Sequence, residues 1–103
     1  MIIGLDVHKD LVYVKRMEKE GKIKEQYEME NSEESWNRFV GKYILEMPGI
    51  ALEASTSGKH VARILRDSGF SVHIADPKKL ALIFNHRKRM ADRIQKILQD
   101  YLD

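Results

Sequence analysis

The sequence predicts an α/β domain in which a mixed five-stranded sheet is flanked by helices. Segments near the N-terminus have the apolar or alternating composition of strands, and the segment over residues 32–44 has helical spacing. Beyond it, strand-like and helix-like segments alternate, as they do in α/β proteins. With 103 residues, the chain has room for one domain with its own core, so residues 1–103 are expected to form a single unit.

The first three strands are predicted within residues 1–30. Residues 1–5 are apolar throughout, as in a strand buried on both faces, and residues 11–14 are β-branched and aromatic. Residues 20–22 supply a turn, so residues 23–30 are expected to return as the second arm of a hairpin. Glu25 interrupts the apolar side of this arm, which predicts a strand near the edge of the sheet.

The first helix is expected to begin after Asn31 and Ser32, which can cap it. Its apolar residues have the spacing of a helix that packs on a sheet, and they are Trp36, Phe39, Val40, Tyr43 and Ile44. Residues 47–49 end the helix because they include proline and glycine, and residues 50–52 form a fourth strand that leads into Glu53.

The remaining elements are a second helix over residues 57–67, a fifth strand over residues 70–74, and a third helix that begins at Asp76-Pro77. The third helix is expected to continue to the end of the chain, with a break near Asn85. Three strands able to pair antiparallel, followed by alternating helices and strands, give the mixed sheet.

Charge and composition restrict the classes of function. Residues 17–35 contain three lysines and seven glutamates, whereas residues 77–103 contain seven basic residues and three aspartates. The basic segment either binds a phosphate-rich partner or forms a solvated helix face. The absence of cysteine excludes disulfides and thiolate metal sites. No apolar stretch is long enough for a membrane span, so a cytoplasmic protein without membrane contact is expected.

Two acidic residues end buried strands, Asp6 the first and Glu53 the fourth. Parallel neighbouring strands would bring the two carboxylates together at the carboxyl edge of the sheet. Like charges held so close share a proton or bind a cation, and oxygen ligands favour Mg²⁺ or Mn²⁺. On spacing alone, a turn aspartate and a solvated strand-end glutamate explain these residues equally well.

Four sequence blocks occur together in one order along the chain. They are Ile3-Gly4-Leu5-Asp6-Val7-His8-Lys9-Asp10; Ala51-Leu52-Glu53-Ala54-Ser55 with Ser57-Gly58; Asp76-Pro77-Lys78-Lys79; and Ala91-Asp92-Arg93-Ile94. In this combination the chain resembles the N-terminal domain of the DEDD transposases, which are insertion-sequence recombinases with a RuvC-like, ribonuclease H-like fold.

The resemblance implies magnesium-dependent cleavage and transfer of DNA strands in transposition and recombination, with Asp6, Glu53 and Asp92 as catalytic and metal-binding residues. The family pattern has a fourth acid three residues after the third, where this sequence has Gln95. Glutamine neutralises a hard cation poorly, so weaker metal binding is expected. The family also has a second domain with a nucleophilic serine, so the chain is expected to be a fragment of a longer protein.

The resemblance further implies DNA and a structured guide RNA as partners. The basic residues expected to contact nucleic acid are Lys9, Lys78, Lys79, Arg87, Lys88, Arg89 and Arg93. An apolar stripe along the last helix lies nearly opposite Asp92 around the helix axis. This stripe packs either on the domain's own sheet or on a second subunit, and the second arrangement predicts a homo-oligomer.

Two other functions fit parts of the sequence. One is an inactive ribonuclease H-like remnant or stand-alone domain that binds nucleic acid or a partner protein without cleaving anything. The other is an actin-like nucleotide-binding half, which fits Gly4-Leu5-Asp6 but lacks a glycine-rich phosphate loop. Residues 55–58 either hold an anion or cap the second helix. His60, His73 and His86 do not have metal-ligand spacing.

Overall fold

The computed structural model of the chain describes residues 1–18, 21–53 and 55–75. Its elements, in chain order, are β1 (Ile2–Val7), β2 (Leu11–Met17), β3 (Ile23–Glu30), α1 (Glu33–Tyr43), β4 (Gly49–Glu53), α2 (Thr56–Asp67) and β5 (Val72–Ala75). The predicted α/β class with a mixed five-stranded sheet is confirmed. The third helix expected from Asp76-Pro77 onward lies outside the described residues.

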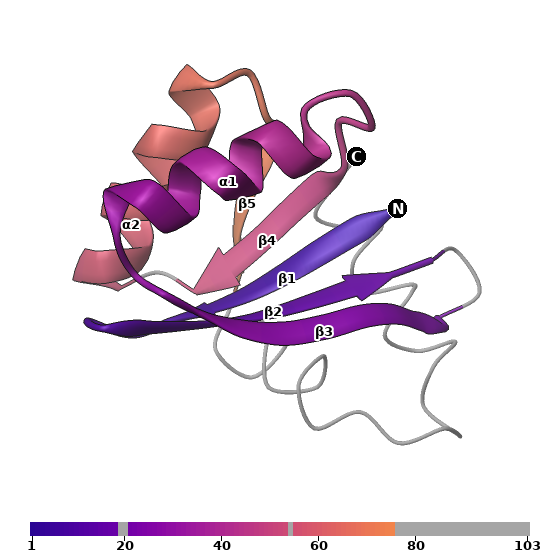
Figure 1. Cartoon of the computed structure of the whole chain (residues 1–103), viewed down its shortest axis with the longest axis horizontal. Helices are drawn as coiled ribbons and strands as arrows, with labels where there is room; N and C mark the ends of the chain where they lie inside the picture. Colours follow the sequence, from indigo (N-terminus) through magenta and orange to yellow (C-terminus); the bar gives the residue numbers. More distant parts are fainter. Residues whose placement is uncertain (19–20, 54, 76–103) are drawn as a thin grey trace.

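The strands are arranged in the order β3-β2-β1-β4-β5. β2 pairs antiparallel with both β1 and β3, whereas β4 pairs parallel with both β1 and β5. Helices α1 and α2 lie over the same face of the sheet (Figure 1). β1 and β4 are therefore parallel neighbours in the middle of the sheet, and β3 is an edge strand, as Glu25 predicted.

The main core lies between this face of the sheet and the two helices. Alternate residues of the central strands point into it, and among them Ile3, Leu5, Ile50 and Leu52 are fully buried. From α1 the core receives three aromatic rings, with 5.4 Å between the ring centroids of Trp36 and Phe39 and 4.8 Å between those of Phe39 and Tyr43. These contacts fix α1 on the sheet through the apolar stripe that the sequence predicts.

β1 and β2 both extend further along the chain than the sequence predicts. β1 continues to Val7 because Val7 pairs with Val12 across the hairpin. β2 continues to Met17, although Lys15 and Arg16 have the charged character of a loop. Arg16 pairs with Glu25 in the strand register, and the Met17 side chain is buried. Cross-strand partners thus keep charged residues in this strand.

Ionic and hydrogen-bonded contacts explain why an acid is tolerated on the inward side of β3. The Tyr43 hydroxyl donates to Glu25 Oε1 at 2.6 Å, and Lys42 Nζ donates to Glu25 Oε2 at 2.6 Å. Arg16 Nη2 donates to Glu46 Oε2, also at 2.6 Å. We call these five residues the Glu25 cluster. It joins the edge of the sheet to the end of α1, and each carboxylate in it has a cationic partner.

The fifth strand begins later than predicted. β5 starts at Val72, and Phe70 precedes it as a buried loop residue whose N–H donates to Leu65 O at 3.0 Å. Gly69 has φ +103°, a conformation that favours glycine, and it follows the C-cap Ser68 at the end of α2.

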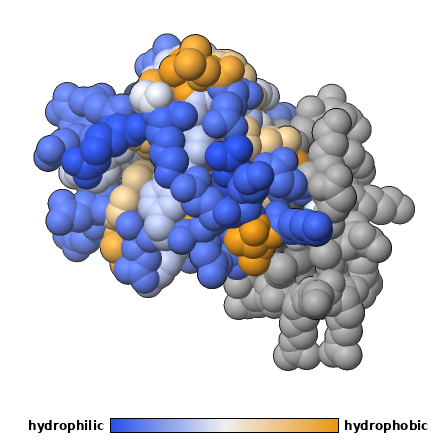
Figure 2. All heavy atoms as spheres, turned by 45° about the vertical axis from the view of Figure 1, so that its right-hand side comes forward, coloured by the Kyte–Doolittle hydropathy of each residue, from blue (hydrophilic) through white to orange (hydrophobic). Residues whose placement is uncertain are grey.

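The surface view in Figure 2 is mainly hydrophilic, with separate hydrophobic spots. The large hydrophobic side chains exposed in the described part of the chain are Tyr13, Ile23, Leu45 and Met47.

Candidate functional site

Asp6 and Glu53 occupy adjacent positions at the carboxyl end of the two central strands. The parallel register places Leu5 opposite Leu52, and the next residues along the two strands are Asp6 and Glu53. Glu53 is the last residue of β4, as predicted, whereas Asp6 is followed by one more strand residue. Neighbouring strands lie about 4.8 Å apart, so the backbones at these two positions are close together, as a shared cation would require.

Both acids point away from the helices. Leu5 and Leu52 face the core beneath α1 and α2, and consecutive residues of a strand face opposite sides. Asp6 and Glu53 therefore share the other face of the sheet. Both residues are intermediate in exposure, and the Asp6 side chain is 32% exposed. We call these two residues the acid pair.

His8 lies beside the acid pair, in the turn between β1 and β2. Its Nε2 is 3.1 Å from Asp6 Oδ2, and the strand register places Tyr13 next to Asp6 on β2. The His8 and Tyr13 rings contact each other edge to face, with 5.8 Å between their centroids. This contact positions one Asp6 oxygen and leaves the other for an additional partner.

The residues of the site fit a hard divalent cation in chemistry but supply only part of a coordination shell. Within residues 1–18, 21–53 and 55–75, no group of three or more His, Cys, Asp or Glu side chains can hold a metal ion. The third predicted ligand, Asp92, lies outside this part of the chain, as does Gln95. Asp6 and Glu53 alone offer oxygen ligands of the kind that Mg²⁺ and Mn²⁺ prefer.

The start of α2 is packed tightly against the end of β4. Ser55 Oγ accepts a hydrogen bond from Gly58 N at 2.9 Å, so Ser55 is the N-cap of the helix, one of the two roles that the sequence left open. A Cβ added to Gly58 would lie 2.2 Å from the Glu53 carbonyl oxygen. The glycine of the Ser57-Gly58 block thus permits the close approach that fixes the backbone at Glu53.

Of the residues predicted to contact nucleic acid, Lys9 is described. It is exposed in the turn that follows β1, on the same edge of the sheet as the acid pair. The other predicted contacts, Lys78, Lys79, Arg87, Lys88, Arg89 and Arg93, lie beyond the described residues.

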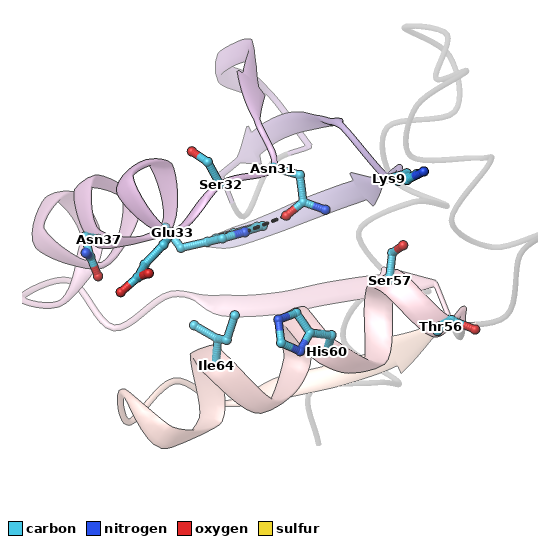
Figure 3. A pocket seen from close by; sticks show the side chains of 10 residues that line it. Lys9, Asn31, Ser32, Glu33, Asn37, Thr56, Ser57, His60 and Ile64 are labelled. Carbon is cyan, nitrogen blue, oxygen red and sulfur yellow. Dashed lines mark hydrogen bonds between the residues drawn. The ribbon is translucent and has the colours of Figure 1, made fainter.

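Lys9 also lines a pocket of about 660 Å³ between α1 and α2. Figure 3 shows Ser57, His60 and Ile64 of α2 on one side of it, and Asn31, Ser32, Glu33 and Asn37 on the other. The sequence assigned no role to His60 because its spacing from the other histidines does not suit a metal. The signal that identifies it is helical, since Ser57, His60 and Ile64 are spaced to share one face of α2.

Comparisons with known protein families and with curated proteins found no match to this chain. Neither α1 nor α2, the helices of the described residues, has the length and apolar composition needed to cross a bilayer.

Proposed function

We propose that this chain is a ribonuclease H-like domain of the DEDD transposase type, which binds Mg²⁺ or Mn²⁺ and acts on DNA strands. The observation that carries the proposal is the position of Asp6 and Glu53, adjacent on one face at the carboxyl ends of parallel β1 and β4. Open α/β sheets place their sites at this edge. The mixed sheet with both connecting helices on one face is compatible with a ribonuclease H-like fold.

Asp6, Glu53 and His8 each have a role in this proposal. Asp6 and Glu53 bind the cation through carboxylate oxygens, and His8 orients Asp6 through the 3.1 Å contact. Asp92 completes the set of acids by resemblance. When bound, the cation supplies positive charge that stabilises the transition state of an in-line displacement at phosphorus. DNA as substrate, a guide RNA and assembly into a homo-oligomer are parts of the proposal that rest on the resemblance.

Metal titration tests the proposal directly. Mn²⁺ added to the chain, followed by calorimetry or by the paramagnetic signal of the free ion, should show a site that Asp6→Asn abolishes. Asp10→Asn is the matched control because Asp10 is an exposed aspartate in the neighbouring turn. The proposal fails if the wild-type chain binds no Mn²⁺, or if both variants bind it as the wild type does.

A second candidate function is favoured by Gln95, which replaces the fourth acid of the family pattern. In this alternative, the domain keeps the fold and binds nucleic acid or a partner protein without cleaving DNA. Metal-dependent nicking of a DNA substrate separates the two candidates, because cleavage that Glu53→Gln abolishes occurs only in the first. A chain that binds DNA but shows no cleavage, even when Gln95→Asp restores the acid, supports the second.

A further inference from the structure

The pocket between α1 and α2 opens at the same end of the sheet as the acid pair. Lys9 comes from the turn after β1, Asn31 directly follows β3, and Ser57 belongs to the first turn of α2. The acid pair points away from the helices, so pocket and acid pair lie on opposite faces of one sheet edge. The volume of about 660 Å³ falls within the usual range for sites that bind small organic groups.

Trp36 and Ile64 are the apolar residues among those that line the pocket. Trp36 is almost fully buried, and its indole Nε1 donates to Asn31 Oδ1 at 2.9 Å, which fixes the ring. Asn31 is itself held, because its Nδ2 donates to the His8 carbonyl oxygen at 2.9 Å. Ile64 lines the wall on the α2 side. A planar ligand can therefore bind here without first ordering the walls, which reduces the entropic cost of binding.

Polar groups of different charge lie toward opposite ends of the pocket. Figure 3 shows Lys9 near one end, and Glu33 and Asn37 toward the other. Among the described residues, no ion pair is found for Lys9 or Glu33. His60 projects between these ends from α2. The pocket thus offers a cation at one end, apolar walls in the middle and hydrogen-bond acceptors at the other end.

We propose that this pocket holds one nucleotide of a single-stranded DNA segment, with its phosphate toward Lys9 and its base toward Glu33 and Asn37. A carboxylate accepts hydrogen bonds from an amino group, so bases with an exocyclic amino group are preferred over thymine. The strand is single because a base inside a duplex cannot enter such a pocket. This inference rests on the proposed function, which supplies a reason for a DNA strand at this sheet edge.

Fluorescence anisotropy of the full chain with labelled twelve-nucleotide oligo(dC) and oligo(dT) tests the proposal. EDTA in the buffer makes binding independent of metal at the acid pair. Oligo(dC) should bind about tenfold more tightly than oligo(dT), as expected for one additional well-placed base contact. Lys9→Ala should weaken binding of both oligonucleotides by about tenfold, whereas Glu33→Ala should remove the preference for oligo(dC).

Two matched controls keep the test specific. Lys22→Ala removes an exposed lysine in the turn between β2 and β3, at the other end of the sheet. Glu34→Ala removes the exposed acid next to Glu33, whose partner is Arg38 outside the pocket. Both controls should bind as the wild type does. Thermal melting of each variant separates loss of binding from loss of folding.

The proposal is overturned if the wild-type chain binds neither oligonucleotide, if it does not prefer oligo(dC), or if Lys9→Ala behaves like Lys22→Ala. The Mn²⁺ titration reports separately on the proposed function. Asp6-dependent Mn²⁺ binding without the expected oligonucleotide behaviour refutes the pocket and leaves the metal site intact. Loss of both refutes both proposals.

Discussion

The acidic residues at the two ends of the sheet differ in whether they have cationic partners. At one end, Glu25 and Glu46 of the Glu25 cluster are paired with cations, and Glu25 also accepts a hydrogen bond from a buried tyrosine hydroxyl. At the other end, Asp6 and Glu53 directly follow the paired residues Leu5 and Leu52, and His8 is the partner found for Asp6 among the described residues. The acids of the Glu25 cluster are neutralised within the fold, whereas the acid pair has no comparable counter-charge among the described residues.

The electrostatics of the Glu25 cluster follow from these contacts. Hydrogen bonds from Lys42 and Tyr43 hold the pKa of Glu25 below its ordinary value. Burial, together with the hydrogen bond to Glu25, raises the pKa of Tyr43 well above its ordinary value. The tyrosine therefore remains a proton donor and the glutamate a charged acceptor near neutral pH. The cluster is expected to be structural, and the acid pair functional.

The largest effect on stability is expected at Gly58, which packs against the backbone of Glu53. Gly58→Ala should lower the free energy of unfolding by about 3 kcal/mol, because the added methyl group would collide with a backbone oxygen of Glu53 that cannot easily move. Gly41→Ala, in open space on α1, is the control and should raise stability by about 1 kcal/mol. Urea unfolding measures both, and equal effects of the two substitutions would contradict the close packing at Glu53.

The next effect tests the Glu25 cluster. Tyr43→Phe keeps the buried ring but removes the hydroxyl that donates to Glu25 at 2.6 Å and lies 3.1 Å from the Tyr27 hydroxyl. Hydrogen bonds to charged groups are strong, so the variant should lose about 2 kcal/mol in thermal or urea unfolding. Tyr13→Phe is the control, since that hydroxyl belongs to a partly exposed side chain, and it should change stability by less than about 0.5 kcal/mol. Similar losses in both variants would count against the cluster.

Most of the sheet could be predicted from the sequence, because alternation and helical spacing record which side chains face the core. The apolar stripe of α1 and the edge position of β3 both followed from such patterns. The C-terminal end of β2 could not be predicted in this way. Lys15 and Arg16 are held in the strand by cross-strand partners, and no local sequence pattern reveals those partners. Long-range pairs of this kind depend on the register between strands, and that register cannot be read from a single sequence.

The candidate site likewise contains some residues that could be predicted from the sequence and others that could not. The strand-end positions of Asp6 and Glu53 were predictable from two short apolar segments, and the parallel register agrees with their expected adjacency. The positions of His8 and His60 could not be predicted from the sequence. That of His8 depends on the turn after β1, and that of His60 depends on which face of α2 lies toward α1. The predicted role of Asp92 remains a prediction.

A smaller effect concerns pH. The folded pKa of Glu25 lies below its ordinary value of 4.5, so the ionised side chain stabilises the fold above that pH, and the contribution disappears as the pH falls through the folded pKa. Glu25→Gln should therefore cost about 1 kcal/mol near neutral pH, and this cost should shrink as the pH is lowered below 4.5. Urea unfolding of both proteins across this range gives the difference, and a constant difference would show that its charge is not what stabilises the cluster.

The smallest effect sharpens the comparison most, because it measures the repulsion inside the acid pair. Two unit charges at a separation of about 6 Å would repel by about 0.7 kcal/mol at the dielectric constant of water. Asp6→Asn removes this repulsion and also the weak exposed contact with His8, so stability should stay the same or rise by about 0.5 kcal/mol. Once Asp6 is neutral, Glu53→Gln should gain less than it does in the wild type. A double-mutant cycle should thus give a coupling of about 0.7 kcal/mol that shrinks in high salt. A coupling of zero would mean that the carboxylates are too far apart to interact or to share a cation, which would remove the distinction between the two ends of the sheet.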